Sequence, residues 1–189
     1  TSSYAQAAAM AMGRAMDDVI IAAATGTAYT GETGATSESA QTAIAASVGT
    51  GTGLNLVKLT TAKRLLDDAD VDPSIPRHII VGPEQLQNLL AVEQVTSSDY
   101  NTVKALVQGE IDSYLGFKFT VSNRLAKSGN DRTCIVYAED GITLGIGKDI
   151  SARIDERADK SYATQVYYCQ SIGATRMESA KVVPITCTE

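Results

Sequence analysis

The strongest hydrophobic pattern lies in the first two dozen residues, where residues 3–25 predict one long helix. Alanine and methionine fill most of this stretch, and alanine is the strongest helix former. Ser2 or Ser3 can cap the first turn, and Gly26 stands where a left-handed C-terminal cap belongs. At about 1.5 Å per residue the helix is about 33 Å long, which is enough to cross a small domain.

The polar residues of this helix occupy one sector, and the remaining surface is too wide for one flat apolar contact. The polar sector holds Gln6, Arg14, Asp17 and Asp18. We therefore expect neighbours on several sides, in the same chain, in other copies of it, or in both. A glutamate at Ala8 or Ala15 should then block folding or assembly. The apolar face is expected to hold Tyr4, Ala8, Met12, Ala15, Val19 and Ala22.

The middle of the chain alternates between glycine-rich and apolar segments. Residues 26–53 are rich in glycine, threonine, serine and alanine, which predicts a long loop with a short helix near residues 39–47. A helix capped by Thr60 or Thr61 is expected to run to about Ala69. Shorter helices are predicted at residues 84–92 and 102–107.

Apolar runs predict the strands, and the last forty residues are rich in them. The segments 151–159 and 161–173 alternate in a way that suits a long antiparallel hairpin, which turns near residues 158–160. The segment before them, residues 141–149, is short and interrupted by glycines. Pro184 suits an edge position or a bulge of the final strand. The other predicted strands cover residues 77–81, 117–121, 133–138 and 180–187.

Composition excludes several classes of protein. The chain has 189 residues, of which 44% are hydrophobic and 20% charged, as in ordinary globular proteins. Its net charge of −6 argues against extensive electrostatic binding to the phosphate backbone of nucleic acid. Arg14, Asp17 and Asp18 near the middle of the first helix argue against a membrane span. The three cysteines, Cys134, Cys169 and Cys187, are too few and too scattered for a disulfide framework, and buried free thiols are expected.

Glycine and aspartate patterns offer weak chemical candidates. Gly49, Gly51 and Gly53 resemble part of a nucleotide-binding loop, but no clear strand precedes them and the Lys-Ser/Thr pair is missing. The acidic run from Asp67 to Asp72 lacks the glycine and the final acid of a calcium loop. A solvated helix end is the favoured interpretation of that run.

His78 is the single histidine of the chain. A catalytic serine or cysteine would need it as a general base, and nothing in the sequence places a nucleophile near it. One histidine and three scattered cysteines give no zinc ligand pair either. The sequence therefore predicts no catalytic, cofactor-binding or metal-binding residues, and no enzyme.

The order of elements and several short sequence motifs resemble those of the major capsid proteins of tailed bacteriophages, which have the Hong Kong 97-like fold. A long alanine-rich helix leads to a Gly/Ser/Thr loop, a helix, a proline-containing turn and an Arg-led strand that ends in proline. The residues that carry the resemblance are Arg77 and Pro83, then Gly109, Gly116, Phe117, Val121, Ser122 and Asn123, and finally Gly173, Arg176, Val182 and Val183.

This resemblance implies an α+β fold with two domains. Residues 1–54 with 150–178 would form a peripheral domain, in which the first helix is the spine and the hairpin lies alongside it. Residues 55–149 with 179–189 would form an axial domain, which meets its copies at pentamer and hexamer centres. Family members carry an N-terminal arm and an extended loop before the spine helix. Since this chain starts at the helix, with Thr1 rather than Met, we expect a trimmed core fragment whose spine helix is partly bare.

The resemblance also implies a function. The chain would be a structural subunit that assembles with copies of itself into an icosahedral phage head around DNA, in the bacterial cytoplasm. Scaffolding, portal or decoration proteins are further candidate partners. One alternative is the shell of an encapsulin-like compartment, which encloses cargo proteins. A third hypothesis, from another class, is a small α/β nucleotide-binding domain that uses the loop from Gly49 to Gly53.

Overall fold

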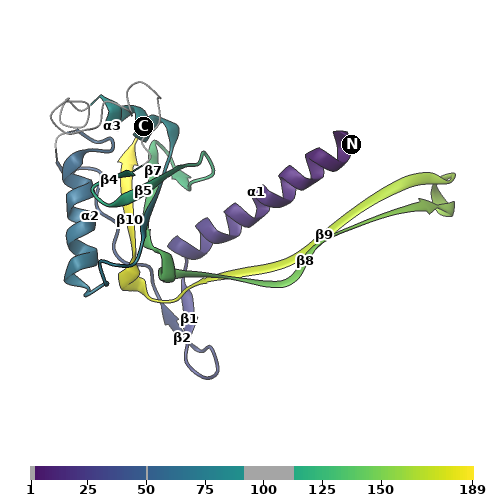
Figure 1. Ribbon diagram of the computed structural model, residues 1–189, viewed down its shortest axis with the longest axis horizontal. Coiled ribbons are helices and arrows are strands. Elements are labelled where there is room, and N and C mark those ends of the chain that lie inside the picture. Colours follow the sequence, from purple (N-terminus) through teal and green to yellow (C-terminus); the bar gives the residue numbers. More distant parts are fainter. Residues whose placement is uncertain (1–2, 50, 92–112) are drawn as a thin grey trace.

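A long helix and a long β-hairpin project from one side of a small mixed sheet in the computed structural model (Figure 1). The structure describes residues 3–49, 51–91 and 113–189, so the helix predicted at residues 102–107 lies outside the described residues. The long helix, α1 (Ser3–Thr25), has the predicted bounds. Its run of strong helix-forming residues explains why the sequence alone predicted these bounds.

The central sheet has the strand order β10-β7-β3-β5-β4, with β6 paired to β7. Strands β3 and β5 are parallel, and the other described pairs are antiparallel. All four strands predicted for this sheet are confirmed, because each is a run of apolar or alternating residues. The strands are β3 (Arg77–Val81), β4 (Ser113–Tyr114), β5 (Phe117–Val121), β6 (Lys127–Ser128), β7 (Asp131–Ala138) and β10 (Val182–Thr188).

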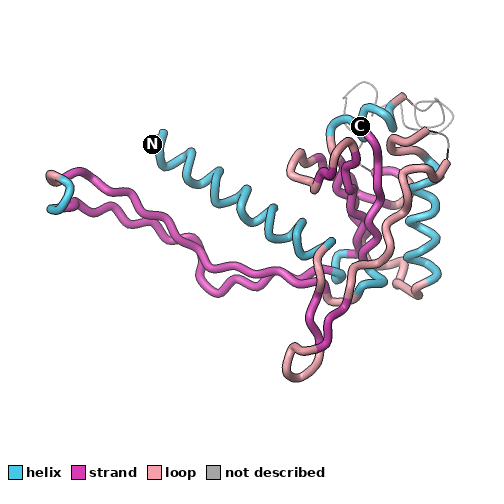
Figure 2. The backbone as a smooth tube through the Cα atoms, turned by 180° about the vertical axis from the view of Figure 1, so that it is seen from behind, coloured by secondary structure: helices cyan, strands magenta, loops and turns pink. Residues whose placement is uncertain are grey.

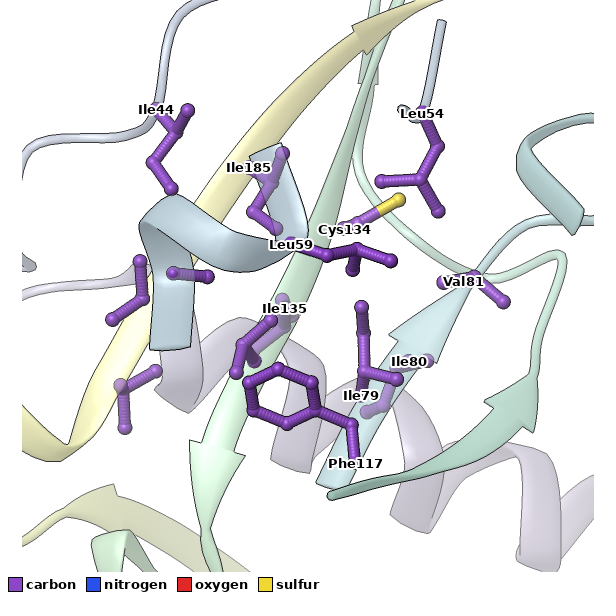
Figure 3. Packing of buried hydrophobic residues seen from close by; sticks show 14 of the residues in the cluster. Ile44, Leu54, Leu59, Ile79, Ile80, Val81, Phe117, Cys134, Ile135 and Ile185 are labelled. Carbon is purple, nitrogen blue, oxygen red and sulfur yellow. The ribbon is translucent and has the colours of Figure 1, made fainter. Parts of the chain in front are cut away.

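The main core lies between this sheet and the helix α2 (Leu56–Asp68). Leu59 and Leu66 of α2 are completely buried, and Figure 3 shows Leu59 among side chains from the strands. Burial of each such leucine contributes about 1.5–3 kcal/mol to stability. The shorter helix α3 (Pro83–Leu90) follows β3 and buries Leu89.

The start of α2 differs from the prediction. Neither Thr60 nor Thr61 caps the helix, because the Asn55 side chain does so by accepting the Lys58 N–H at 2.9 Å. Asparagine is among the best N-cap residues. The two threonine hydroxyls instead donate to the Val57 carbonyl inside the helix, at 3.0 and 2.7 Å.

The helix predicted at residues 39–47 is wrong. Residues 26–38 form a small hairpin of β1 (Ala28–Thr30) and β2 (Thr36–Glu38), and the chain then runs along the outer edge of β10. There the Ile44 N–H donates to the Pro184 carbonyl, and the Ile44 carbonyl accepts from Thr186, both at 2.9 Å. Hydrogen bonds to the edge strand thus hold this segment in an extended conformation. Pro184 lies in that edge strand, as predicted.

The long hairpin consists of β8 (Ile142–Arg157) and β9 (Ala163–Arg176), joined by the short turn η3 (Ala158–Lys160). The turn lies where the sequence predicted it. The glycine-interrupted segment 141–149 is not separate, because most of it forms the first half of β8. Irregular pairing between Ile146 and Ser151 accommodates the extra residues there as a bulge.

Arg176, at the end of β9, joins the helix, the small hairpin and the large hairpin. Its buried guanidinium donates to the carbonyl oxygens of Ala24 (3.1 Å) and Gly26 (2.8 Å) at the end of α1, and to that of Glu38 (3.0 Å). A cation at the C-terminal end of a helix also complements the helix dipole. Figure 2 shows α1 and the hairpin leaving this junction together and diverging farther out.

Candidate functional site

The described part of the loop that contains Gly49 and Gly53 directs backbone carbonyl oxygens at a lysine. The Lys58 ammonium is buried and donates to the carbonyl oxygens of Thr52 (2.8 Å), Gly53 (2.7 Å) and Thr186 (3.2 Å). Burial lowers the pKa of Lys58. A phosphate site needs backbone N–H groups that point at the ligand, whereas these carbonyls point at a cation. The geometry therefore disfavours the nucleotide-binding hypothesis.

The acidic run after α2 serves the local structure. Asp67 pairs with the buried Arg77 at 2.7 Å, and the Asp72 carboxylate accepts the backbone N–H of Ser74 at 2.8 Å. These hydrogen bonds from Ser74 lower the pKa of Asp72. In the described part of the chain, no three His, Cys, Asp or Glu side chains cluster as a metal site would require.

His78 lies on the sheet face opposite α2 and stacks on Tyr137 of the neighbouring strand. The two ring centroids are 5.4 Å apart, with an angle of 22° between the planes. Such an offset aromatic pair contributes to packing. This packing contact is typical of a structural histidine, which is the role that the sequence favoured for His78.

Two of the three cysteines are buried free thiols, as predicted. Cys134 and Cys187 lie on the adjacent strands β7 and β10. A hydrogen bond to Cys187, together with burial, raises the pKa of Cys134. Both thiols face the interior beside Lys58, where they fill space in the core.

Cys169 is different, because it is partly exposed on the hairpin and has two polar neighbours. The β8 bulge brings Ser151 Oγ to 3.0 Å and Lys148 Nζ to 3.2 Å from its sulfur. Hydrogen bonds from Ser151 and Lys148 lower the pKa of Cys169. The sequence analysis missed this cluster, since the bulge that aligns the three side chains leaves no clear spacing signal.

Among the described residues, several large apolar side chains of α1 and of the hairpin are exposed. On α1, Tyr4 is 80% exposed and Met10 is 64% exposed. No charged residue occurs between Ser3 and Gly13, and we call this N-terminal half of α1 the helix tip. No helix in the described part of the chain combines the length and apolar character that a membrane crossing requires.

The apolar face predicted for α1 is partly correct. Ala8, Met12, Ala15 and Val19 are partly covered, whereas Tyr4 and Ala22 are exposed. The difference arises because α1 meets the hairpin along one narrow side, near the contact in which Gln170 Nε2 donates to the Met12 carbonyl (3.3 Å). Within this chain Tyr4 and Met10 are largely exposed, and a trimmed fragment with a partly bare spine helix stays a prediction.

In the far half of the hairpin, one side is apolar as far as the Ile154–Val166 pair and ends in Glu156 and Thr164 near the turn. Ile154 is 69% exposed and Val166, its partner across the strands, is 43% exposed. The opposite side carries Arg153 and Asp155, together with Tyr167, which is 51% exposed. The apolar side is the one that faces α1 nearer the sheet, and we call its far part the distal strip; it consists of Ala152, Ile154, Val166 and Tyr168.

Comparison with known proteins gives a family match over the entire chain. A family model described as phage capsid protein matches residues 1–189. No curated protein matches the chain in sequence.

Several solved capsid structures share its fold. A chain from Mycobacterium phage Che8 has a TM-score of 0.66 at 21% identity, and the match covers 97% of this chain and 63% of that one. The capsid of cyanophage P-SCSP1u has a TM-score of 0.64 at 16% identity, covering 98% and 65%. The capsid of cyanophage Pam1 has a TM-score of 0.66 at 13% identity, covering 97% and 67%.

These likenesses establish the fold. They confirm the predicted α+β class and the Hong Kong 97-like architecture, with its long helix, long hairpin and mixed sheet. The chain spans less than two thirds of the chains from phage Che8 and cyanophage P-SCSP1u.

Proposed function

Because the chain belongs to the phage capsid protein family, we propose that it is a major capsid subunit, which assembles with copies of itself into the shell of a phage head. The observation that carries the proposal is the family match over residues 1–189. The bare apolar surfaces of α1 and the hairpin support it, since apolar surface without a partner in the chain is typical of association sites.

The proposal includes a structural role without catalysis. The side chains considered for chemistry, Lys58, Asp67, Asp72 and His78, all have structural contacts that account for them. The subunit would act by binding its copies through many modest contacts, and the location would be the virion, after assembly in the bacterial cytoplasm. Scaffolding, portal and decoration proteins are further proposed partners.

We also retain the predicted division into domains as a proposal. A peripheral domain would hold residues 1–54 and 150–178, and an axial domain residues 55–149 and 179–189. The long helix and the hairpin leaving the sheet from one junction at Arg176 support this division. Pentamer and hexamer centres would then be formed by the axial domain.

The test is to express the complete gene product and examine it by electron microscopy and sedimentation. Closed shells are expected, and uniformly small monomers would refute the proposal. DNA inside purified shells is expected for a phage head, whereas enclosed protein cargo would favour an encapsulin-like compartment. A thermal shift with ATP or NAD would instead revive the nucleotide-binding hypothesis.

A further inference from the structure

The long helix and the long hairpin are complementary surfaces that meet along part of their length. Near the central sheet they pack together, and the Gln170–Met12 hydrogen bond is the outermost bond recorded between them in the described residues. Farther out the two elements diverge, as Figures 1 and 2 show. The helix tip and the distal strip therefore do not cover each other within one chain.

The distal strip continues a surface that already has a partner. Along β9 the residues on the side facing α1 become steadily less exposed toward the junction, from Val166 through Gln170 to the buried Arg176. Beyond the helix the same side still carries Ile154 and Val166, whereas Arg153 and Asp155 lie on the opposite side; Glu156 ends the apolar run near the turn. An alternating strand pattern indicates that one side is buried. The four residues of the distal strip are of the kinds found on a buried strand face, but α1 of the same chain does not cover them.

The helix tip has the matching chemistry. It carries no charge that burial would have to desolvate, and Tyr4 and Met10 are largely exposed. Nearer the sheet, the same helix packs against the same side of the hairpin. The parts of these two elements that lie nearer the sheet thus already pack on each other within one chain.

We propose that the helix tip of one copy packs on the distal strip of a second copy. This inference rests on the proposed function and names the contact by which two subunits recognise each other. Two different surfaces meet, so the contact is heterologous: the first copy keeps its distal strip free, and the second copy keeps its helix tip free. Such a contact continues from copy to copy and closes into rings when the geometry allows. It also gives the hairpin the packing partner that an isolated two-stranded hairpin needs for stability.

A charge exchange tests the contact in the complete gene product. Met10→Glu places a negative charge on the helix tip, and Ile154→Lys places a positive charge on the distal strip. Each change alone buries an unpaired charge in the contact, and the yield of shells should fall at least about tenfold. The double variant forms a Glu–Lys pair between copies, and most of the yield should return. Gln165→Lys, which adds the same charge to the opposite side of the hairpin, should assemble like the wild type.

Circular dichroism and thermal melting of each variant show whether its monomer still folds. As a second measurement, chains with Met10→Cys are co-assembled with chains with Ile154→Cys, both in a Cys169→Ser background, and treated with a short bismaleimide. Cross-linked dimers are expected in the mixture and not with either chain alone.

The outcomes separate the two proposals. If the wild type forms no shells, the proposed function fails. If the wild type forms shells while both single variants assemble normally, or the double variant does not recover, or the mixture gives no cross-linked dimer, the inference is refuted and the proposed function stands.

Discussion

At the scale of single residues, the ion pairs of Glu189 connect three segments of the chain. Its carboxylate pairs with Lys127 and Arg132 and accepts an N–H from Gln85 at 3.2 Å. The hydrogen bonds from Arg132 and Lys127 lower the pKa of Glu189 from 4.5 to about 2. The last strand is thereby fastened to α3 and to the β6–β7 turn.

This lowered pKa predicts an acid dependence of stability. The folded state prefers the ionised carboxylate, so the stabilisation is complete above pH 4.5 and is lost as the pH falls toward about 2. Glu189→Gln should remove this part of the acid dependence. Urea denaturation of both proteins at about pH 6 and about pH 3 measures it. Glu32→Gln, in the exposed β1–β2 turn, is the control, and an acid dependence unchanged in Glu189→Gln would contradict the prediction.

Cys169 should be the most reactive thiol of the chain. Hydrogen bonds from Ser151 and Lys148 favour its thiolate and lower its pKa, whereas Cys134 and Cys187 are buried. Lys148→Met should therefore move the midpoint of its pH–rate profile for alkylation by iodoacetamide to higher pH. Lys160→Met, in the hairpin turn, should leave the midpoint in place. Equal midpoints in all three proteins would show that Lys148 does not activate the thiol.

The sequence could assign residues whose role follows from local spacing. It left the acidic run and His78 without chemistry, because each lacked the partners that a site requires at a defined distance; that absence stays a prediction, and both have structural contacts. It could not find the Cys169 cluster or the cage around Lys58. Those depend on a bulge and on residues far apart in the chain, such as Lys58 and Thr186, which come together through tertiary packing.

At the scale of elements, the helix and strand patterns predicted most of the fold. The long helix, the hairpin turn and the core strands were confirmed, since their periodicity extends over many residues. The failures lie at residues 39–47, where an alanine-containing segment pairs with the edge of β10, and at the cap of α2. Tertiary pairing overrides helix propensity in the first case, and an earlier asparagine outcompetes the threonines in the second.

A charge on the covered side of α1 should destabilise the fold according to its distance from the sheet. Ala15 is partly buried on the side that meets the hairpin, so Ala15→Glu should lower the free energy of unfolding by about 1–3 kcal/mol. Ala8→Glu should cost less, because Ala8 lies beyond Met12, where the outermost described hydrogen bond between α1 and the hairpin forms, and it should act on shell assembly. Ala9→Glu, on the exposed side, should stay within about 0.5 kcal/mol of the wild type. Urea denaturation gives these values, and an equal loss in all three would refute the placement.

At the scale of the whole molecule, a few contacts hold the projecting helix and hairpin to the sheet. Ile21 and Ala24 of α1 join the core, and the Asp18–Arg124 ion pair lies at the exposed rim. Arg176 carries the buried polar part of this junction. The sequence could indicate two units from the order of elements. It could not indicate which residue joins them, since the partners of Arg176 lie about 140 residues or more away in the chain.

Arg176→Ala should therefore loosen the projecting unit without unfolding the sheet. Its loss leaves the carbonyls of Ala24, Gly26 and Glu38 without their donor, and buried groups left unpaired cost about 1–3 kcal/mol each. We expect a loss of more than about 2 kcal/mol in the free energy of unfolding, and faster proteolytic cleavage near the end of α1 than within β3. Arg157→Ala removes an exposed arginine paired with Asp159 in the hairpin turn, and its effect should stay below about 1 kcal/mol. If both variants were cleaved at the wild-type rate and at the same sites, the junction would not depend on Arg176.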